Sequence, residues 1–186
     1  MPVYHENRLG AFSSFEALCD FVERRRETPG SFEEFEQELG ERMRVFECDV
    51  KAEQLARYDV DAEVIMVAGQ EMRRCLMKEP KEYLSSSGPI TVKRNLFRSS
   101  AGVKSVCALE LRAGIVGGLC TPVLARQVTY AMGQMTSAET AALFHEFGVQ
   151  GPSASTCDRI PKVVGEAWER NREAWESALR AQETVP

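Results

Sequence analysis

Apolar residues recur every three or four positions in the first third of the chain, which is the spacing of an amphipathic helix. One stripe follows this spacing: Phe32, Phe35, Leu39, Met43 and Phe46. Ser13-x-x-Glu16 and Ser31-x-x-Glu34 match the capping box, in which a hydroxyl and a carboxylate bind free amides at a helix start. Thr28-Pro29-Gly30 separates the two expected helices. The pattern therefore predicts an N-terminal helical segment over residues 1–60.

The pattern changes to alternation in the middle of the chain, as expected for β-strands. Residues 63–67 and 71–77 flank a turn, and a second turn at residues 85–89 leads into a strand over 90–98. Lys78-Glu79-Pro80 is expected to interrupt the sheet, because proline cannot donate to a β-ladder. In the last strand we place Ile90, Val92 and Leu96 on one face and Thr91, Lys93 and Asn95 on the other. A small antiparallel β-meander over residues 61–118 is predicted.

Helical spacing returns after residue 118. Thr121-Pro122 is expected to open a helix, Thr136-x-x-Glu139 is a third capping box, and Gly148 is expected to end the second helix. Ser153 then caps a short helix over 154–160, which Pro161 limits or kinks. A separate long helix from Lys162 to Gln182 carries Trp168 and Trp175. Residues 119–186 are thus predicted to form a helix-turn-helix followed by a long helix, which makes the fold class α+β.

Composition narrows the class of protein further. The 186 residues are 44% hydrophobic with a net charge of −5, values typical of an ordinary folded protein. No apolar run approaches the roughly 20 residues of a membrane span. The first residues show no signal-peptide pattern, so we expect a cytoplasmic protein without membrane contact. The six cysteines form no C-x-x-C pair, and we expect them to be small buried side chains rather than zinc ligands.

Charge is distributed unevenly along the chain. Residues 1–60 carry eight basic and fourteen acidic side chains, whereas residues 72–104 carry eight basic and two acidic ones. A local basic face can bind phosphates in a protein that is acidic as a whole. Lysines and arginines on a sheet also serve as solvated residues that discourage aggregation. Charge alone therefore does not decide whether the basic residues of the meander bind phosphates or are simply solvated.

The helix after Ser153 is the candidate for reading DNA. Helical spacing places Ala154, Cys157 and Ile160 on the packed face and Ser155, Thr156 and Arg159 on the opposite face. In a helix-turn-helix such an exposed face enters the major groove. A generic helical hairpin without DNA is the alternative interpretation of the same pattern.

Motifs for catalysis are missing from the sequence. There is no Gly-x-x-x-x-Gly-Lys-Ser/Thr loop, no Gly-x-Ser-x-Gly elbow and no set of acids that suggests a metal-dependent nuclease. We therefore expect no catalytic residue, no metal, no cofactor and no small-molecule substrate.

Ordered blocks of residues resemble a known family over residues 32–182. The blocks are Val64-x-x-Val67-x-Gly69, Arg73-Arg74, Tyr83-Leu84, Gly88-Pro89-Ile90-Thr91-Val92-Lys93-Arg94, Leu96-Phe97-Arg98, Leu109-Glu110-Leu111-Arg112-Ala113-Gly114-Ile115-Val116, Thr121-Pro122, Ala125-Arg126-Gln127, Pro152-Ser153-x-Ser155-Thr156 and Arg159-Ile160-Pro161-Lys162. Together they resemble the N-terminal region of ISKra-type insertion-sequence transposases. The resemblance implies a DNA-binding and assembly region that recognises transposon ends. The family's ribonuclease H-like catalytic domain is expected beyond Pro186, so strand cleavage and DNA recombination are not carried over to this chain.

The predicted partner is double-stranded DNA with terminal inverted repeats, together with a second copy of the chain or a full-length transposase. Five residues are expected to face the groove: Ser153, Ser155, Thr156, Arg159 and Lys162. Six residues are expected to neutralise phosphates: Arg73, Arg74, Lys93, Arg94, Arg98 and Arg126. One alternative function is a protein-interaction module, in which the acidic N-terminal helix and the Trp168/Trp175 helix drive oligomerisation. Another is a DNA-binding regulator derived from a transposase. A third is a nuclease assembled with a separate catalytic chain.

Overall fold

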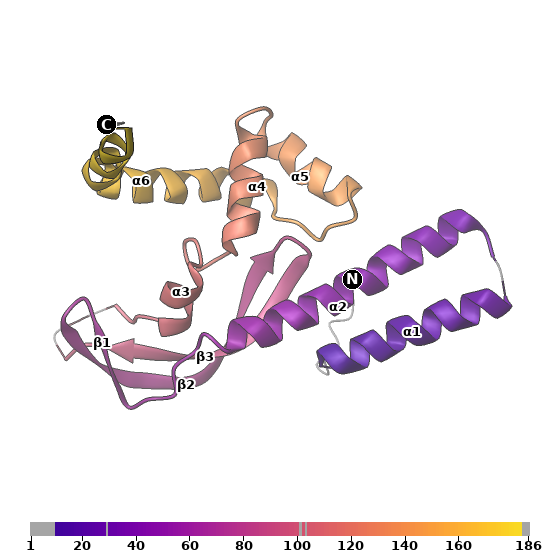
Figure 1. The fold of residues 1–186 in the computed structure, drawn as a ribbon, viewed down its shortest axis with the longest axis horizontal. Coiled ribbons are helices and arrows are strands. Elements are labelled where there is room, and N and C mark those ends of the chain that lie inside the picture. Colours follow the sequence, from indigo (N-terminus) through magenta and orange to yellow (C-terminus); the bar gives the residue numbers. More distant parts are fainter. Residues whose placement is uncertain (1–9, 29, 101, 103, 184–186) are drawn as a thin grey trace.

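The computed structural model describes residues 10–28, 30–100, 102 and 104–183. In chain order, the elements in these ranges are α1 (Ala11–Glu27), α2 (Phe32–Ala56), β1 (Val64–Val67), β2 (Gln70–Ser85), β3 (Gly88–Arg98), α3 (Ala108–Ala113), α4 (Pro122–Met132), α5 (Ser137–Glu146) and α6 (Ala154–Glu183). This confirms the predicted α+β class. In Figure 1 the α1–α2 hairpin projects to one side of the sheet, and α4, α5 and α6 lie above it.

The α1–α2 hairpin is held by aromatic contacts between antiparallel helices. Phe21 is buried and stacks on Phe35 with ring centroids 5.6 Å apart. The predicted cap at Ser31 is confirmed, since its side chain accepts a hydrogen bond from the Glu34 amide at 3.1 Å. The cap predicted at Ser13 is wrong, because α1 begins at Ala11 with Gly10 as its N-cap. The Ala11 amide instead donates to a Glu53 carboxylate oxygen at 2.8 Å, a partner that is distant in sequence.

The three strands form an antiparallel sheet in the order β1-β2-β3. The predicted interruption at residues 78–80 is wrong, because β2 runs through them opposite β3. The pairing register shifts on either side of Leu76, and Lys78 has a positive φ of 51° while its amide donates to the Asn95 side chain. Pro80 is tolerated because β1 pairs only with residues 70–73, which leaves this part of β2 at a sheet edge.

The faces of β3 match the prediction only in part. Ile90 and Val92 are buried and Lys93 is exposed, as expected. Asn95, predicted on the solvent face, is instead 3% exposed. Its amide group donates to an Asp59 carboxylate oxygen at 2.9 Å and to the Val60 carbonyl at 3.1 Å. The segment before β1 therefore covers this end of the strand, which alternation within the strand itself does not reveal.

The sheet shares its main core with α2 and with the short helix α3. The core residues are Cys48, Leu55, Tyr83, Ile90, Val92, Cys107 and Leu109. This core crosses the boundary predicted at residue 60. The sequence patterns also missed α3, since six residues are too few to show a helical period. Gly114, with φ of 66°, ends this helix in the left-handed conformation that glycine adopts readily.

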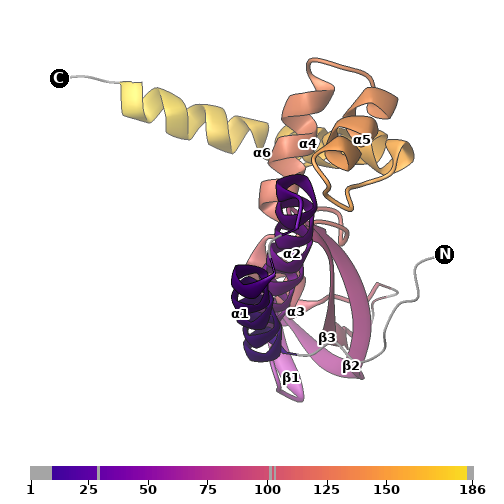
Figure 2. The ribbon, with the colours of Figure 1, turned by 90° about the vertical axis from the view of Figure 1, so that its right-hand side faces the viewer.

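Helices α4, α5 and α6 enclose a second core. Its buried members are Cys120, Leu124, Ala125, Val128, Cys157 and Ile160. Pro122 is the first residue of α4, and Thr136 and Glu139 form the predicted capping box of α5. The short helix predicted to end at Ile160 and the separate helix predicted from Lys162 are wrong, because α6 is one helix from Ala154 to Glu183 with Pro161 inside it. Figures 1 and 2 show that α6 changes direction and that its end extends away from the other elements.

The cysteines and tryptophans divide between core and surface. Cys48, Cys107, Cys120 and Cys157 are buried as predicted, whereas Cys19 and Cys75 are exposed. Trp168 is partly exposed, and the side chain of Trp175 lies outside the described part of the structure. Within the described ranges, none of the helices combines the length and apolar character needed to cross a bilayer.

Candidate nucleic-acid interface

The turn between α5 and α6 is tight because glycines occupy its two crowded positions. Gly148 has a φ of 67°, and its amide donates to the His145 carbonyl at 2.8 Å. Val149 then donates to the Phe144 carbonyl at 3.0 Å. A Cβ atom on Gly151 would lie only 2.6 Å from the Phe144 Cβ, so a larger residue there would push the turn away from α5. These contacts fix how α6 leaves α5.

The start of α6 has a capped end and a packed side. The Ser153 hydroxyl accepts a hydrogen bond from the Thr156 amide at 3.4 Å, which confirms Ser153 as the cap. Cys157 and Ile160 are buried in the second core, as predicted. Thr156 is half-buried, with its hydroxyl 3.1 Å from that of Ser153, so both hydroxyls serve the start of the helix.

The opposite side of α6 presents three exposed polar residues in one row. Ser155, Arg159 and Lys162 are exposed and follow the spacing i, i+4, i+7, which aligns them along the helix. Asp158 is exposed beside the row, and Glu166 follows one turn after Lys162. The basic residues of this row, Arg159 and Lys162, therefore lie in the first turns of α6, the part that a helix-turn-helix inserts into a groove.

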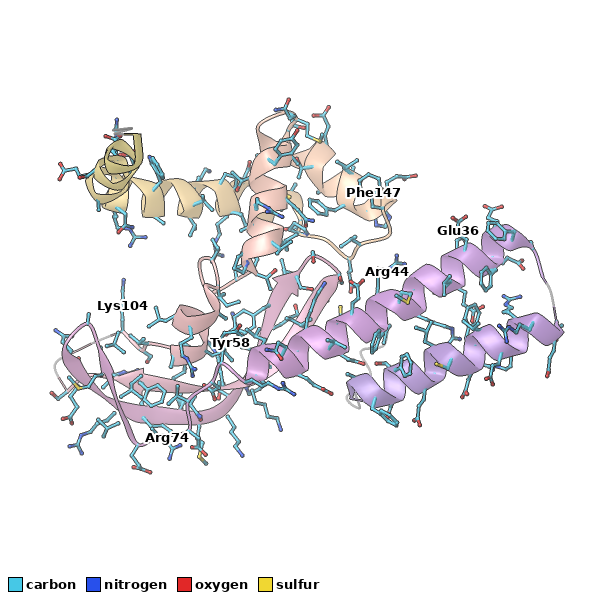
Figure 3. All side chains as sticks on the ribbon, viewed as in Figure 1. Glu36, Arg44, Tyr58, Arg74, Lys104 and Phe147 are labelled. Carbon is cyan, nitrogen blue, oxygen red and sulfur yellow. The ribbon has the colours of Figure 1, made fainter. Side chains whose placement is uncertain are left out.

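The turn is also braced by the rest of the molecule. A Cβ atom on Gly148 would lie 3.0 Å from a guanidinium nitrogen of Arg44, and one on Gly88 would lie 3.9 Å from the Gln150 Cβ. Figure 3 shows Arg44 on the side of α2 that faces this turn. Helix α2 and the β2–β3 turn thus lie close against the helix-turn-helix.

Two of the predicted phosphate contacts are engaged elsewhere. Arg74 donates to Asp61 at 2.5 Å and to Glu63 at 3.0 Å, with 18% of its side chain exposed. Arg94 forms an ion pair with Glu110, with 15% of its side chain exposed. Carboxylates from other segments already neutralise these two guanidinium groups, so we leave both residues out of the candidate interface.

Arg94 belongs to a partly buried polar network. The Tyr83 hydroxyl donates to the same Glu110 carboxylate oxygen, Oε1, at 2.8 Å, and the Arg94 guanidinium lies 6.0 Å from the centre of the Tyr83 ring. Burial, reinforced by the hydrogen bond to Glu110, raises the pKa of Tyr83 far above its ordinary value. Burial also raises the pKa of the neighbouring Cys107 thiol. The network joins β2, β3 and α3, which is a structural role.

The other predicted cations are exposed but scattered. Arg73 pairs with Glu71 at 3.2 Å, and Arg98 donates to the Ser105 hydroxyl at 3.1 Å. Lys93 and Arg126 are exposed and make no ion pair within the described part of the chain. Figure 3 shows Arg74 below the sheet and Lys104 above it. The basic residues of the meander therefore do not form one continuous face with the start of α6.

A second polar cluster, which the sequence patterns did not reveal, lies at the β2–β3 turn. Lys51 donates to the Ser86 hydroxyl at 3.1 Å and to Glu47 at 3.3 Å, and it also contacts Ser87. The hydrogen bond from Ser87 lowers the pKa of Glu47. Because these side chains form hydrogen bonds with one another, the cluster anchors the β2–β3 turn to α2. Among the residues that the structure describes, no group of histidine, cysteine and acidic side chains could hold a metal ion.

The geometry defines an α+β protein with a braced C-terminal helix-turn-helix. Comparison with protein-family models, with curated protein sequences and with solved structures finds no match to this chain.

Proposed function

We propose that this chain binds double-stranded DNA through the first turns of α6, in the manner of a transposase region that recognises transposon ends. The observation that carries the proposal is the row of Ser155, Arg159 and Lys162, exposed opposite the buried Cys157 and Ile160 behind a braced turn. The B-DNA major groove accommodates one α-helix, and a row of this kind reaches base edges and phosphates.

Each residue in the row suits a different contact. The Arg159 guanidinium can donate two parallel hydrogen bonds to a guanine, the most common specific contact in the major groove. The Ser155 hydroxyl lies 3.0 Å from that of Ser153 and can use its remaining donor or acceptor capacity for either type of base edge. Lys162, one turn later, suits a phosphate, and Arg126 on α4 is another exposed cation. The carboxylates of Asp158 and Glu166 repel the DNA phosphates, so we expect a small number of phosphate contacts.

The test compares arginines on the same helix. Duplexes that bind are first selected from a random pool, and fluorescence anisotropy then measures the affinity over a range of salt concentrations. With Lys162 and Arg126 at phosphates, log K should fall with log salt with a slope of about −2. Arg159→Ala should lower the affinity for the preferred DNA sequence by about tenfold to a hundredfold. Lys162→Ala should lower the affinity for all duplexes alike and reduce the slope of log K against log salt by about one.

Arg172→Ala is the matched control. Arg172 lies on α6 well beyond the row, is exposed, and pairs with Glu176 at 2.7 Å. We expect this variant to bind DNA like the wild type. Equal binding by wild type, Arg159→Ala and Arg172→Ala, with no sequence preference in any of them, would refute the proposed function.

A further inference from the structure

The α1–α2 hairpin exposes an apolar face that no other element of the described structure covers. Its members on α1 are Phe12, Phe15 and Val22, and those on α2 are Phe32, Met43 and Val50. Their spacing places each set along one side of its helix. Phe12 is 73% exposed and Phe32 is 74% exposed, values unusual for phenylalanines in a folded monomer.

The two sets lie on the same side of the hairpin. The Phe15 ring on α1 lies 5.6 Å from the Phe46 ring on α2. Val22 and Phe32 line one shallow pocket together with Arg26. Since the helices are antiparallel, Phe12 lies at the base of the hairpin beside the Glu53 end of α2, and the pocket lies at its tip. We call this surface the hairpin face.

The exposed apolar area of the hairpin face is comparable to the area that a specific dimer interface buries. A phenylalanine buries about 200 Å², so the exposed fractions of Phe12, Phe15 and Phe32 (73%, 47% and 74%) leave roughly 400 Å² of aromatic surface in water. Two copies facing each other would bury about 800 Å² from these rings alone, and a specific interface needs about 1,200 Å² in total. The aliphatic members and the rim account for the difference.

We infer that the hairpin face binds a second copy of the chain, with the two hairpins antiparallel. A twofold interface must be self-complementary, so a projection at one end of the patch needs a recess at the other. Phe12 projects at the base, and the pocket of Val22, Arg26 and Phe32 is the recess at the tip. In the antiparallel arrangement each Phe12 enters the partner's pocket. This association goes beyond DNA binding and does not depend on it.

Charge supports the same arrangement. Arg26 at the tip and Glu16 near the base are both exposed, and neither forms an ion pair within the described ranges. Antiparallel pairing brings each Arg26 towards the partner's Glu16, a contact that adds orientation more than affinity. Pairing about an axis parallel to the helices would instead place each Phe12 opposite the base of the partner and leave both pockets without a projecting side chain.

Sedimentation velocity over about 1 µM to about 100 µM tests the association. The wild type should form dimers. Phe12→Glu should weaken the dimer about a hundredfold, because the change occurs twice and each buried ring contributes about tenfold. Val45→Glu is the matched control: Val45 is 56% exposed on α2 but lies off the hairpin face, so the variant should dimerise like the wild type. A monomer at every concentration, larger aggregates, or equal effects of the two variants would overturn the inference.

Cysteine cross-linking tests the orientation. The twofold axis passes midway between Phe12 and the pocket, close to the exposed Cys19. In a Cys75→Ser background, where Cys19 is the exposed cysteine, a short bismaleimide should link two copies efficiently. Adding Cys19→Ser or Phe12→Glu should abolish the product. A dimer that resists Cys19 cross-linking would overturn the antiparallel arrangement.

Discussion

Substitution of Arg94 by alanine separates the structural role of this residue from a role in DNA binding. The side chain is 15% exposed and its partner Glu110 is 22% exposed, so removing the guanidinium leaves a mostly buried carboxylate that still accepts a hydrogen bond from the Tyr83 hydroxyl. Breaking a fully buried ion pair costs about 3–5 kcal/mol. Because solvent reaches part of this pair, we expect a loss of about 2–3 kcal/mol in the free energy of unfolding.

Urea denaturation followed by circular dichroism measures this loss. With a slope of about 2 kcal/mol per molar urea, the midpoint should fall by about 1 M. Arg98→Ala is the control on the same strand, since Arg98 is exposed and donates to the Ser105 hydroxyl; its effect should stay within about 0.5 kcal/mol. A double variant with Arg94→Met and Glu110→Leu should be more stable than the two single effects predict, because it leaves no charge unpaired.

One pattern of results would contradict a structural role for Arg94. If Arg94→Ala unfolds at the wild-type urea concentration but binds DNA more weakly and with a less steep salt dependence, then Arg94 contacts phosphates. The ion pair with Glu110 would in that case contribute nothing measurable to stability.

Three further predictions test other parts of the structure. Gly148→Ala should lower the free energy of unfolding by about 1–2 kcal/mol in urea, because φ is 67° and Arg44 crowds the new Cβ; Gly165→Ala, with open space around it, should not destabilise. The lowered pKa of Glu47 means that its stabilisation is complete above pH 4.5 and is lost as pH falls through the lowered value, so Glu47→Gln should make thermal unfolding less sensitive to acid. Maleimide labelling of the native protein should modify Cys19 and Cys75, because the other four thiols are buried and burial raises the pKa of Cys120 to about 11; equal labelling of all six would contradict this packing.

Local signals predicted local structure well. Ser31 and Thr136 cap helices as the sequence pattern indicates, and Pro122 opens α4, since each of these features depends on residues within one turn. The packed side of α6 at Cys157 and Ile160 was also predictable from helical spacing. The same locality explains the errors at Pro80 and Pro161. Whether a proline breaks an element depends on edge position and tertiary support, which short patterns do not contain.

The ion pairs of the arginines were not predictable from local patterns. Arg74 is paired with acids that come 13 and 11 residues earlier, and Arg94 with one that comes 16 residues later. A count of charges along the sequence treats these side chains as free, although the fold brings carboxylates to them. Arg159 and Lys162 remain exposed because the opposite side of α6 packs on α4. Charge density in sequence therefore did not show which arginines the fold leaves without a carboxylate partner.

Helix α2 connects the two proposed surfaces physically. Its first half carries the hairpin face with Phe32 and Met43, its middle braces the α5–α6 turn through Arg44, and its last turns enter the main core through Leu55. A continuous helix of 25 residues keeps these regions in a fixed relation. If both proposals hold, a twofold dimer through the hairpin face presents two α6 helices related by the same axis. The preferred duplex would then contain inverted half-sites, because the symmetry of a DNA site mirrors that of the dimer that reads it.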